Sequence, residues 1–513
     1  MNYLNSRPRL VLLLALTLLG TAVPAIAAES SGSGSHNPWL EHRDRLLREP
    51  GLIRYFTFEK VDPTATIANL AAREGALSYQ VHKEKGASAE PLTVVDGQWP
   101  GKKAVRLDRG CLTAPTFPLG NKGFSLEGWF RVNGPGVHRG VGGATNGALL
   151  SLGNGYWEGW RLTMTYPEKS FRFEIGKPQP SHAEGLNTRP VADRIWHHLA
   201  ATWDGQQMRI YVDGRMAAFA PLAGKFTPPD PKQAFRIGFA NSGVGSVVLD
   251  VDEVAIFDRA IDAGDVLRHA CPLAAVSPAV AAQIHAASDA LLANQPAAAE
   301  AELRGVLQTP ALQTDLRATV QLQLADILNT QRKFAATGRE MGELLRDPDL
   351  SPRHVQAATS VLLRILREAP GTTLPQDIQP RVLALADLTP IERIAARLNP
   401  GHAALASGDY AAARTEYGRV AAQSDAPPAL RSVAQLHRAE SYVCQKDFAA
   451  AKSEYAKILQ MPDVPPHYRW EAKQRMAQLD RILAGLPPRD PAASRIQLAE
   501  PPPPALSSTP VAL

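Results

Sequence analysis

The 513-residue chain has no strong excess of charge of either sign. Its 55 lysines and arginines are offset by 50 aspartates and glutamates, which leaves a formal net charge of +5. Basic and acidic residues are interspersed along the chain instead of gathering in runs. A nucleic-acid-binding surface needs a concentrated positive potential. We therefore expect no nucleic-acid partner.

The chain also lacks a long apolar run after its N-terminal segment. Within that segment, Leu10–Leu19 follows Arg7 and Arg9 and precedes the small residues 25–27, an order typical of a secretory signal peptide and its cleavage site. The run is too short to span a bilayer, and no Cys follows it to carry a lipid anchor. We predict a signal peptide over residues 1–27, no membrane span, and an exported protein that is periplasmic, cell-surface or secreted.

Cysteine is scarce, with three residues in the whole chain. So few thiols suit an exported protein with few disulfides. The length excludes a single continuous core, because single cores stop growing at roughly 250–300 residues. We therefore expect several domains, separated by changes in composition.

Turn signals and short apolar runs dominate the first half of the chain. The turn Asp204-Gly205 separates the runs His198–Trp203 and Met208–Val212, and Asp213-Gly214 follows at once. Asp-Gly between β-rich runs predicts a hairpin, because Gly adopts a positive φ without steric cost. Similar runs, bounded by Gly, Pro, Asn or Asp, extend from Leu52 to Phe257 and predict an antiparallel β-sandwich. The expected strands are 52–58, 104–107, 124–132, 149–152, 161–165, 171–175, 198–203, 208–212, 216–220, 235–238 and 247–257.

This region resembles the laminin-G-like, concanavalin A-like jelly-roll domains. The resemblance rests on the WHH and YVDG sequences within Trp196–Gly214, on Ile53–Glu59 as the opening strand, on Phe124–Phe130, and on the closing segment Asp252–Ile261. It implies a jelly-roll β-sandwich over residues 50–272. Domains of this fold serve as binding modules far more often than as enzymes, which makes a binding role the first expectation.

The resemblance also implies a metal site and a disulfide. Many such domains bind calcium at the rim of the sandwich, and the corresponding oxygen ligands here are Glu59, Asn69 and Asp252. The alternative is that Asp252 only orders the backbone beside it. The first and last strands of jelly rolls often carry a disulfide, so Cys111 and Cys271 are expected to pair, with two unpaired thiols as the alternative.

The composition changes near Ser277, where Ala, Leu, Gln and Arg begin to recur at helical spacing. Gly408–Ala413 recurs as Lys446–Ala451, and Asn294–Ala299 as Arg332–Ala336, each time 38 residues further on. A fixed period of this size indicates a solenoid of paired helices, about eleven of them up to Gly485. The third cysteine, Cys444, is expected to be buried on one of these helices.

The repeat unit resembles the tetratricopeptide repeat, because a Gly-Asp-Tyr sequence opens a helix with small Ala residues along it. It is longer than the usual ~34 residues. Four prolines are expected to end helices and lengthen loops: Pro370, Pro375, Pro380 and Pro390. We predict a tetratricopeptide-like α-solenoid over residues 276–486, preceded by a linker and short helix over 28–49 and followed by a disordered Pro-rich tail over 487–513.

Signals for catalysis are weak. Glucanases of the concanavalin fold place acids at alternate positions of one strand, so that both carboxylates face one cleft. Asp250 and Asp252 satisfy this spacing, but Glu253 is expected to point to the opposite side and Ala255 stands where a further acid would be needed. No nucleophile motif is recognisable either. We therefore predict a protein that is not an enzyme, with a glycoside hydrolase as the alternative.

Sugar binding needs exposed aromatic rings and polar groups near a rim loop. Tyr156 and Trp157 lie at a turn between two expected strands, and the Gly-rich segment Gly134–Gly147 forms a long loop nearby in the sequence. Tyr156 and Trp157 are therefore the predicted ligand-binding residues.

Taken together, these features predict an exported, non-catalytic binding protein. The β-sandwich would recognise a glycan or a protein surface, with calcium as the one expected cofactor. The helical repeats would dock a protein partner. The alternatives are an assembly scaffold that binds no small ligand, and a glycan-active hydrolase.

Overall fold

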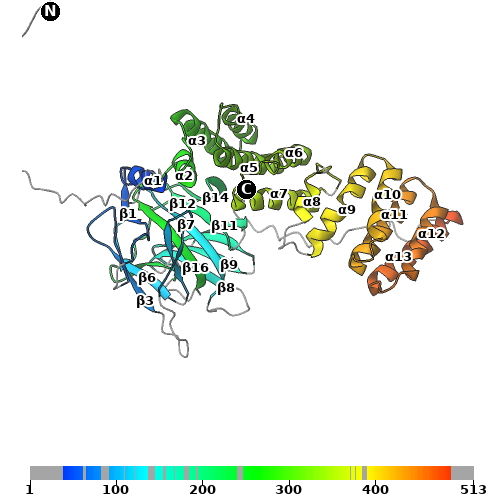
Figure 1. Ribbon diagram of the computed structural model, residues 1–513, viewed down its shortest axis with the longest axis horizontal. Coiled ribbons are helices and arrows are strands. Elements are labelled where there is room, and N and C mark those ends of the chain that lie inside the picture. Colours follow the sequence, from blue (N-terminus) through cyan, green and yellow to red (C-terminus); the bar gives the residue numbers. More distant parts are fainter. Residues whose placement is uncertain are drawn as a thin grey trace, which may run out of the picture. The chain divides into compact units, whose positions relative to one another are not determined.

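The computed structural model describes most of the chain from Pro38 to Leu486. The described ranges are 38–61, 65–81, 92–108, 110–120, 122–136, 145–153, 157–166, 168–177, 184–191, 194–239, 246–369, 371–375, 377–383 and 390–486. They show an antiparallel β-sandwich followed by a helical region, which confirms the predicted fold class (Figure 1). The predicted signal peptide and Pro-rich tail lie outside the described residues.

Two antiparallel sheets of eight strands form the sandwich. Sheet A runs in the order β14 (Arg215–Pro221), β13 (Gln207–Val212), β12 (His197–Trp203), β7 (Phe124–Pro135), β16 (Val247–Phe257), β5 (Lys103–Leu107) and β4 (Thr93–Asp96), and β1 (Leu52–Phe56) also pairs with β16. Sheet B runs in the order β11 (Glu184–Pro190), β10 (Ser170–Ile175), β9 (Trp160–Tyr166), β8 (Thr145–Leu152), β15 (Ala234–Ile237), β6 (Gly110–Pro115), β3 (Leu77–Val81) and β2 (Thr66–Ile67). All eleven expected strands are present, whereas β2, β3, β4, β6 and β11 were not predicted.

The hairpin around Asp213-Gly214 forms as its sequence predicts. Asp213 and Gly214 both have positive φ, 52° and 82°, which suits a tight turn between the right-twisted strands β13 and β14. Trp203 and Trp160 lie in the core between the two sheets. Trp129 is also buried, but on the outer face of sheet A, against Trp39 and Trp99.

Helices follow the sandwich and one precedes it. Their bounds are α1 Pro38–Leu46, α2 Ala263–Ala270, α3 Pro278–Leu292, α4 Pro296–Leu307, α5 Thr314–Thr330, α6 Phe334–Leu344, α7 Pro352–Glu368, α8 Gln379–Leu383, α9 Pro390–Ala406, α10 Tyr410–Ala421, α11 Pro428–Cys444, α12 Phe448–Gln460 and α13 Pro466–Leu483. Eleven of them, α3–α13, lie in the part of the predicted solenoid that the structure describes, which agrees with the expected number. None of the described helices is long and apolar enough to cross a membrane.

The 38-residue period is also seen in the prolines that begin helices. Pro352, Pro390, Pro428 and Pro466 each begin a helix, and each lies 38 residues after the one before. Proline suits the first helical position because the N–H it lacks would have no partner there. The expectation that Pro380 and Pro390 end helices is therefore wrong, since Pro380 is the second residue of α8 and Pro390 begins α9. The resemblance of these repeats to the tetratricopeptide repeat stays a prediction.

The outer face of sheet A packs against the first helices. One apolar cluster joins Tyr211 and Phe257 of this face to Leu267 of α2, Ile284 of α3 and Leu324 of α5. Further along the face, the Arg353 guanidinium of α7 lies 4.8 Å from the ring centre of Trp129. Sheet A is therefore covered on its outer side by α1 and by helices that follow it in the sequence.

The predicted disulfide between Cys111 and Cys271 is wrong, because both are free thiols. Cys111 lies on β6 of sheet B, whereas Cys271 follows α2 and packs with the helices that cover sheet A. The Cys271 thiol instead lies 3.7 Å from the hydroxyl of Thr319. Cys444 is exposed at the end of α11, so the expectation that it is buried is wrong as well.

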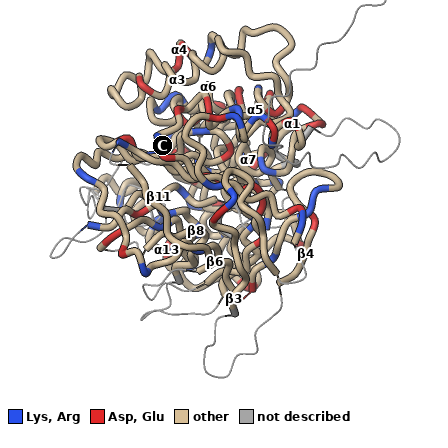
Figure 2. Tube along the Cα trace, turned by 90° about the vertical axis from the view of Figure 1, so that its left-hand side faces the viewer, with Lys and Arg blue, Asp and Glu red and all other residues tan. Residues whose placement is uncertain are grey.

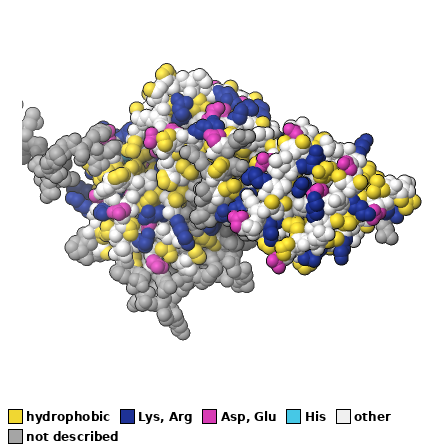
Figure 3. All heavy atoms as spheres, turned by 45° about the vertical axis from the view of Figure 1, so that its right-hand side comes forward, with side chains coloured by type: hydrophobic (Ala, Val, Ile, Leu, Met, Phe, Trp, Pro, Cys, Tyr) yellow, Lys and Arg dark blue, Asp and Glu magenta, His cyan; other side chains and the backbone are white. Residues whose placement is uncertain are grey.

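Lys and Arg positions alternate with Asp and Glu positions over the described part of the chain (Figure 2). The face shown in Figure 3 likewise carries Lys and Arg among Asp and Glu, with hydrophobic side chains between them. This distribution agrees with the even charge pattern of the sequence.

Candidate functional site

Polar side chains form one row across the outer face of sheet B. The ladder register pairs them from one strand to the next, and residues directly opposite in an antiparallel pair project to the same face. Their chain neighbours Leu162 and Phe173 point into the core between the sheets. We call this set the transverse polar row; its members are Ser78, Thr113, Arg236, Ser151, Arg161 and Glu174.

An ion-paired carboxylate lies at one end of the row. Glu174 accepts a hydrogen bond from Arg161 Nε, and its Oε1 lies 3.1 Å from Arg172 Nε. The side chains of Arg161 and Glu174 are 7% and 4% exposed, whereas that of Arg172 is 30% exposed. Buried charges persist only when they are paired. The pair therefore fixes the position of Glu174 and leaves Arg172 partly open to solvent.

Arg172 extends the polar surface toward the edge strand β11. It donates a hydrogen bond of 3.2 Å to Asn187 Oδ1. A Cβ atom at Gly185 would lie 2.3 Å from a terminal nitrogen of Arg172, so glycine leaves room there for the guanidinium. On its other side Arg172 faces Thr163, whose buried hydroxyl has no hydrogen-bond partner among the described residues. The outer face of sheet B thus holds the donors of Arg172 and the carboxylate of Glu174 in fixed positions.

Trp157 stands at the edge of sheet B where β8 and β10 end and β9 begins. Its side chain is 41% exposed. The turn that carries it is held by hydrogen bonds from the Asp230 backbone to Glu158, 3.0 Å, and from Gly159 to the Thr227 carbonyl, 2.9 Å. The last paired residues of β9 and β10 at this edge are Trp160 and Ile175, and they lie next to the pair Arg161 and Glu174. Trp157 therefore lies at the end of the strands that carry Arg161 and Glu174, while Tyr156 lies outside the described residues.

The acids of sheet A occupy a different environment. A bulge opposite Gly128 gives Glu253 a φ of 54° and turns its side chain to the same side as Asp252. Both carboxylates contact the ammonium of Lys102, at 2.6 and 2.8 Å. The expectation that Glu253 points to the opposite side is therefore wrong, because a regular strand was assumed.

Lys102 cannot neutralise both carboxylates. All three side chains are buried, and Glu253 also accepts a hydrogen bond from the hydroxyl of Tyr55. Burial and the charge of Glu253 raise the pKa of Asp252 to about 8, although Lys102 opposes the shift. Burial likewise raises the pKa of Glu253. The cluster therefore favours a bound proton at neutral pH.

The three predicted calcium ligands do not fit a calcium ion. Asp252 and Glu59 both lie near the Lys102 ammonium, at 2.6 and 3.9 Å, so a cation already occupies the space between them. Asn69 Oδ1 accepts hydrogen bonds from the backbone of Tyr55 and Ala71. Among the described residues, no group of three or more His, Cys, Asp or Glu could hold a metal ion. We therefore assign no metal to this position.

Asp250 also faces outward from sheet A, but it is fully paired. Arg106 donates two hydrogen bonds to it, at 2.6 and 2.9 Å, and Arg131 donates another at 2.7 Å. Although burial opposes the shift, these bonds keep the pKa of Asp250 below its usual range. The carboxylates at alternate positions thus each bind basic side chains of the protein, instead of facing an open cleft together.

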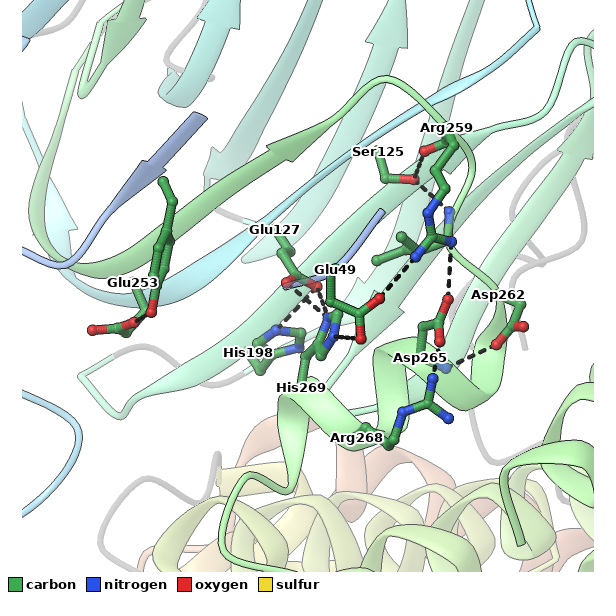
Figure 4. A network of polar contacts seen from close by, with 12 residues as sticks. Glu49, Ser125, Glu127, His198, Glu253, Arg259, Asp262, Asp265, Arg268 and His269 are labelled. Carbon is green, nitrogen blue, oxygen red and sulfur yellow. Dashed lines mark hydrogen bonds and ion pairs between the residues drawn. The ribbon is translucent and has the colours of Figure 1, made fainter. Parts of the chain in front are cut away.

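A buried network joins Glu127 of sheet A to His269 of α2 and to Glu49, which follows α1 in the chain (Figure 4). Glu127 of β7 lies 2.9 Å from His269 of α2 and 3.6 Å from His198. Although burial opposes it, the charges of Glu127 and Glu49 raise the pKa of His269 to about 9. Burial lowers the pKa of His198 to about 4. The network therefore pairs one charged and one neutral histidine with Glu127 at neutral pH.

The sequence did not reveal Arg161, Arg172 and Glu174 as a group. Each alternates with apolar residues along its own strand, which places it on an outer face. Only the hairpin register between β9 and β10 shows that they lie side by side. The sequence signal was therefore the charge inside two apolar strands that are adjacent in the chain.

Several solved structures resemble part of the chain. The binding domain of Paraclostridial Mosquitocidal Protein 1 is 14% identical, with 43% of this chain and 52% of that chain covered and a TM-score of 0.33. A botulinum neurotoxin type C structure, described by its interaction with two ganglioside molecules, is 13% identical, with 44% and 51% covered and a TM-score of 0.32. The chain spans about half the length of both.

A third similar structure is domain 4 of AbnA, a GH43 extracellular arabinanase from Geobacillus stearothermophilus, in complex with arabinotriose. It is 14% identical, with 44% of this chain and 100% of that chain covered and a TM-score of 0.34. A search of curated protein sequences finds no match. Residues 108–267 match the family model of the concanavalin A-like lectin/glucanases superfamily, which supports the predicted concanavalin A-like domain.

Proposed function

We propose that this is an exported, non-catalytic binding protein that recognises a glycan on the outer face of sheet B. The observation that supports this most is the charged end of the transverse polar row, on strands whose end carries the exposed Trp157. An aromatic ring stacks on a sugar face, and fixed donors and acceptors such as Arg172 and Asn187 bind hydroxyl groups. The match of residues 108–267 to a superfamily that includes lectins agrees with this role.

The arrangement of acids favours binding over hydrolysis. Glycoside hydrolysis uses two carboxyl groups on either side of the scissile bond. On β8, β9, β10 and β15 the sequence contains one carboxylate, Glu174, and two guanidinium groups pair with it. If the alternative of a hydrolase were correct, Glu174→Gln would abolish the turnover of a polysaccharide that the wild-type protein cleaves.

The direct test is a glycan array with the full-length mature protein, followed by calorimetric titration of the bound glycans. We expect Trp157→Ala to lower the affinity by up to about tenfold, the loss expected for one stacked aromatic ring. Trp470→Ala is the matched control, because Trp470 of α13 is also exposed, at 65%, but lies in the helical region. Equal affinity of both variants would reject this site, and no glycan bound by the wild-type protein would favour an assembly scaffold.

We also propose that the helical region docks a protein partner. Its last helix, α13, exposes Trp470 and Leu483, at 65% and 56%. Exposed large apolar side chains of this kind suit a protein contact. For a partner that binds the wild-type protein, Trp470→Ala should weaken binding and Trp157→Ala should not, and the reverse order would contradict the assignment.

A further inference from the structure

A cavity of about 590 Å³ lies where the sandwich meets the helices. Its walls come from β11 and β14, the end strands of the two sheets, and from helices α5 and α7. Val212, Ala217 and Val361 give part of the lining apolar character. The volume falls within the range of roughly 300–1,000 Å³ that is usual for small-molecule sites.

Guanidinium groups dominate the polar part of this cavity. The acidic residues that line it are Asp326 and Glu368. The basic residues that line it are Arg189, Arg215, Arg353, Arg364 and Arg367. Five positive charges against two negative ones give the cavity a positive character, although the chain as a whole is nearly balanced.

Asp326 is shared among several of these arginines. Its two oxygens lie 2.8 Å from a terminal nitrogen of Arg215 and 3.1 Å from one of Arg364. The charge of Arg189 also acts on Asp326 through space. One carboxylate therefore serves guanidinium groups from β14, α7 and β11, and it cannot neutralise all of them.

The same guanidinium groups have unused hydrogen-bond donors. The Nε atoms of Arg215, Arg353 and Arg364 are buried and have no acceptor among the described residues. The side chains of Arg353 and Arg364 are 5% and 9% exposed. Buried donors without partners cost stability, and they commonly mark a bound ion, ligand or water. The described residues therefore supply fewer acceptors around these arginines than the guanidinium groups have donors.

We propose that this cavity binds a small organic anion that carries a carboxylate or phosphate group. Arginine recognises both groups with paired hydrogen bonds, because the guanidinium fork matches two oxygens of the anion. The apolar part of the ligand would lie against Val212, Ala217 and Val361. Since the walls belong to the sandwich and to the helices, bound ligand would stabilise their junction. The site is separate from the glycan face proposed on sheet B.

If the arginines of the cavity only connected the sandwich to the helices, fewer of them would be needed. The bridge from Arg215 through Asp326 to Arg364 already ties β14, α5 and α7 together. Arg353 has its own partner outside the cavity, Asp315, at 3.2 Å. Arg189 adds positive charge beyond what this bridge needs, and an anionic ligand accounts for it.

The test uses the full-length mature protein and four probes: glucose 6-phosphate, glucuronate, glucose and inorganic phosphate. We expect calorimetric titration to detect binding of at least one of the two organic anions and no binding of glucose. Arg189→Met should lower that affinity about tenfold or more, as expected for one charged hydrogen bond. Ser360→Trp, on the exposed side of α7, should block the cavity without removing a charge. Arg419→Met, on the exposed side of α10 and outside both proposed sites, is the control that should leave the affinity unchanged.

Three results would overturn the proposal. One is the absence of binding for both organic anions. Another is binding that Arg189→Met and Ser360→Trp leave unchanged. The third is inorganic phosphate binding as tightly as glucose 6-phosphate, which would exclude an organic ligand. Loss of glycan binding in Trp157→Ala would not affect any of these readouts, so the two proposals fail independently.

Discussion

The two sheets of the sandwich both carry buried charges on their outer faces, but they satisfy them in different ways. On sheet A, Glu127 contacts His269 of α2, a helix that follows the sandwich in the chain. On sheet B, Glu174 pairs with Arg161 and Arg172, both on strands of the same sheet. Charges on sheet A therefore connect helices to the sandwich, whereas charges on sheet B pair within the sheet and leave Arg172 partly exposed. This difference is why we place recognition on sheet B.

The largest expected contrast concerns a single cation on each face. Lys102→Met leaves Asp252 and Glu253 buried without their counter-ion, so it should lower the free energy of unfolding by about 3–5 kcal/mol. Arg172→Met removes a partly exposed cation from sheet B and should cost at most about 1 kcal/mol. Urea unfolding of both variants at pH 7 measures the contrast.

The stability that Lys102→Met loses at pH 7 should be partly regained at low pH. The raised pKa of Asp252 means that this group stabilises the fold below pH 4, and that this contribution is lost as the pH rises toward 8. With Asp252 and Glu253 protonated, the lost cation matters less, so the difference from the wild-type protein should shrink near pH 5. A difference that does not depend on pH would contradict the pairing.

The next contrast uses the pKa of His269. Its raised pKa, about 9, contributes stability that is complete below pH 6.5 and is lost as the pH rises to 9. Glu127→Gln removes the main cause, so it should cost up to about 3 kcal/mol at pH 6 and little at pH 9. Glu174→Gln on sheet B, which has no histidine partner among the described residues, should show no such pH dependence. Chemical unfolding at the two pH values distinguishes these outcomes.

A smaller effect is expected at Gly185. Alanine there would push the flexible guanidinium of Arg172 aside, so the stability should change by less than about 1 kcal/mol. Glycan affinity should nevertheless fall, because Arg172 no longer lies over β11. Calorimetric titration compares this variant with Gly120→Ala, where the nearest atom to the added carbon is the backbone nitrogen of Lys122 at 3.9 Å. Equal affinities would show that the position of Arg172 is not important.

The smallest stability effect is expected at Trp157. Its exposure predicts that Trp157→Ala changes the free energy of unfolding by no more than about 0.5 kcal/mol. By contrast, Trp129→Ala removes a buried ring from the outer face of sheet A and should cost about 3–5 kcal/mol. Thermal unfolding of the two variants shows whether the two tryptophans differ in this way.

The features that were predicted correctly from the sequence are those that depend on residues close together in the chain. The turn at Asp213-Gly214 and the 38-residue period of the helices are local patterns, and both are present. The bulge at Glu253 was not predictable, because one extra residue in a strand leaves no sequence signal of its own but reverses the direction of a side chain. The covering of Trp129 by Trp39 and Arg353 was also missed, since these residues are far apart in the chain.

The measurement that tests the central comparison most directly is hydrogen–deuterium exchange of the full-length protein, with and without a glycan that it binds. Binding on sheet B predicts slower exchange in β9 and β10 and around Trp157, and unchanged exchange in α1, α2 and β16. Slower exchange confined to α1, α2 and β16 would place the ligand on sheet A and contradict the account.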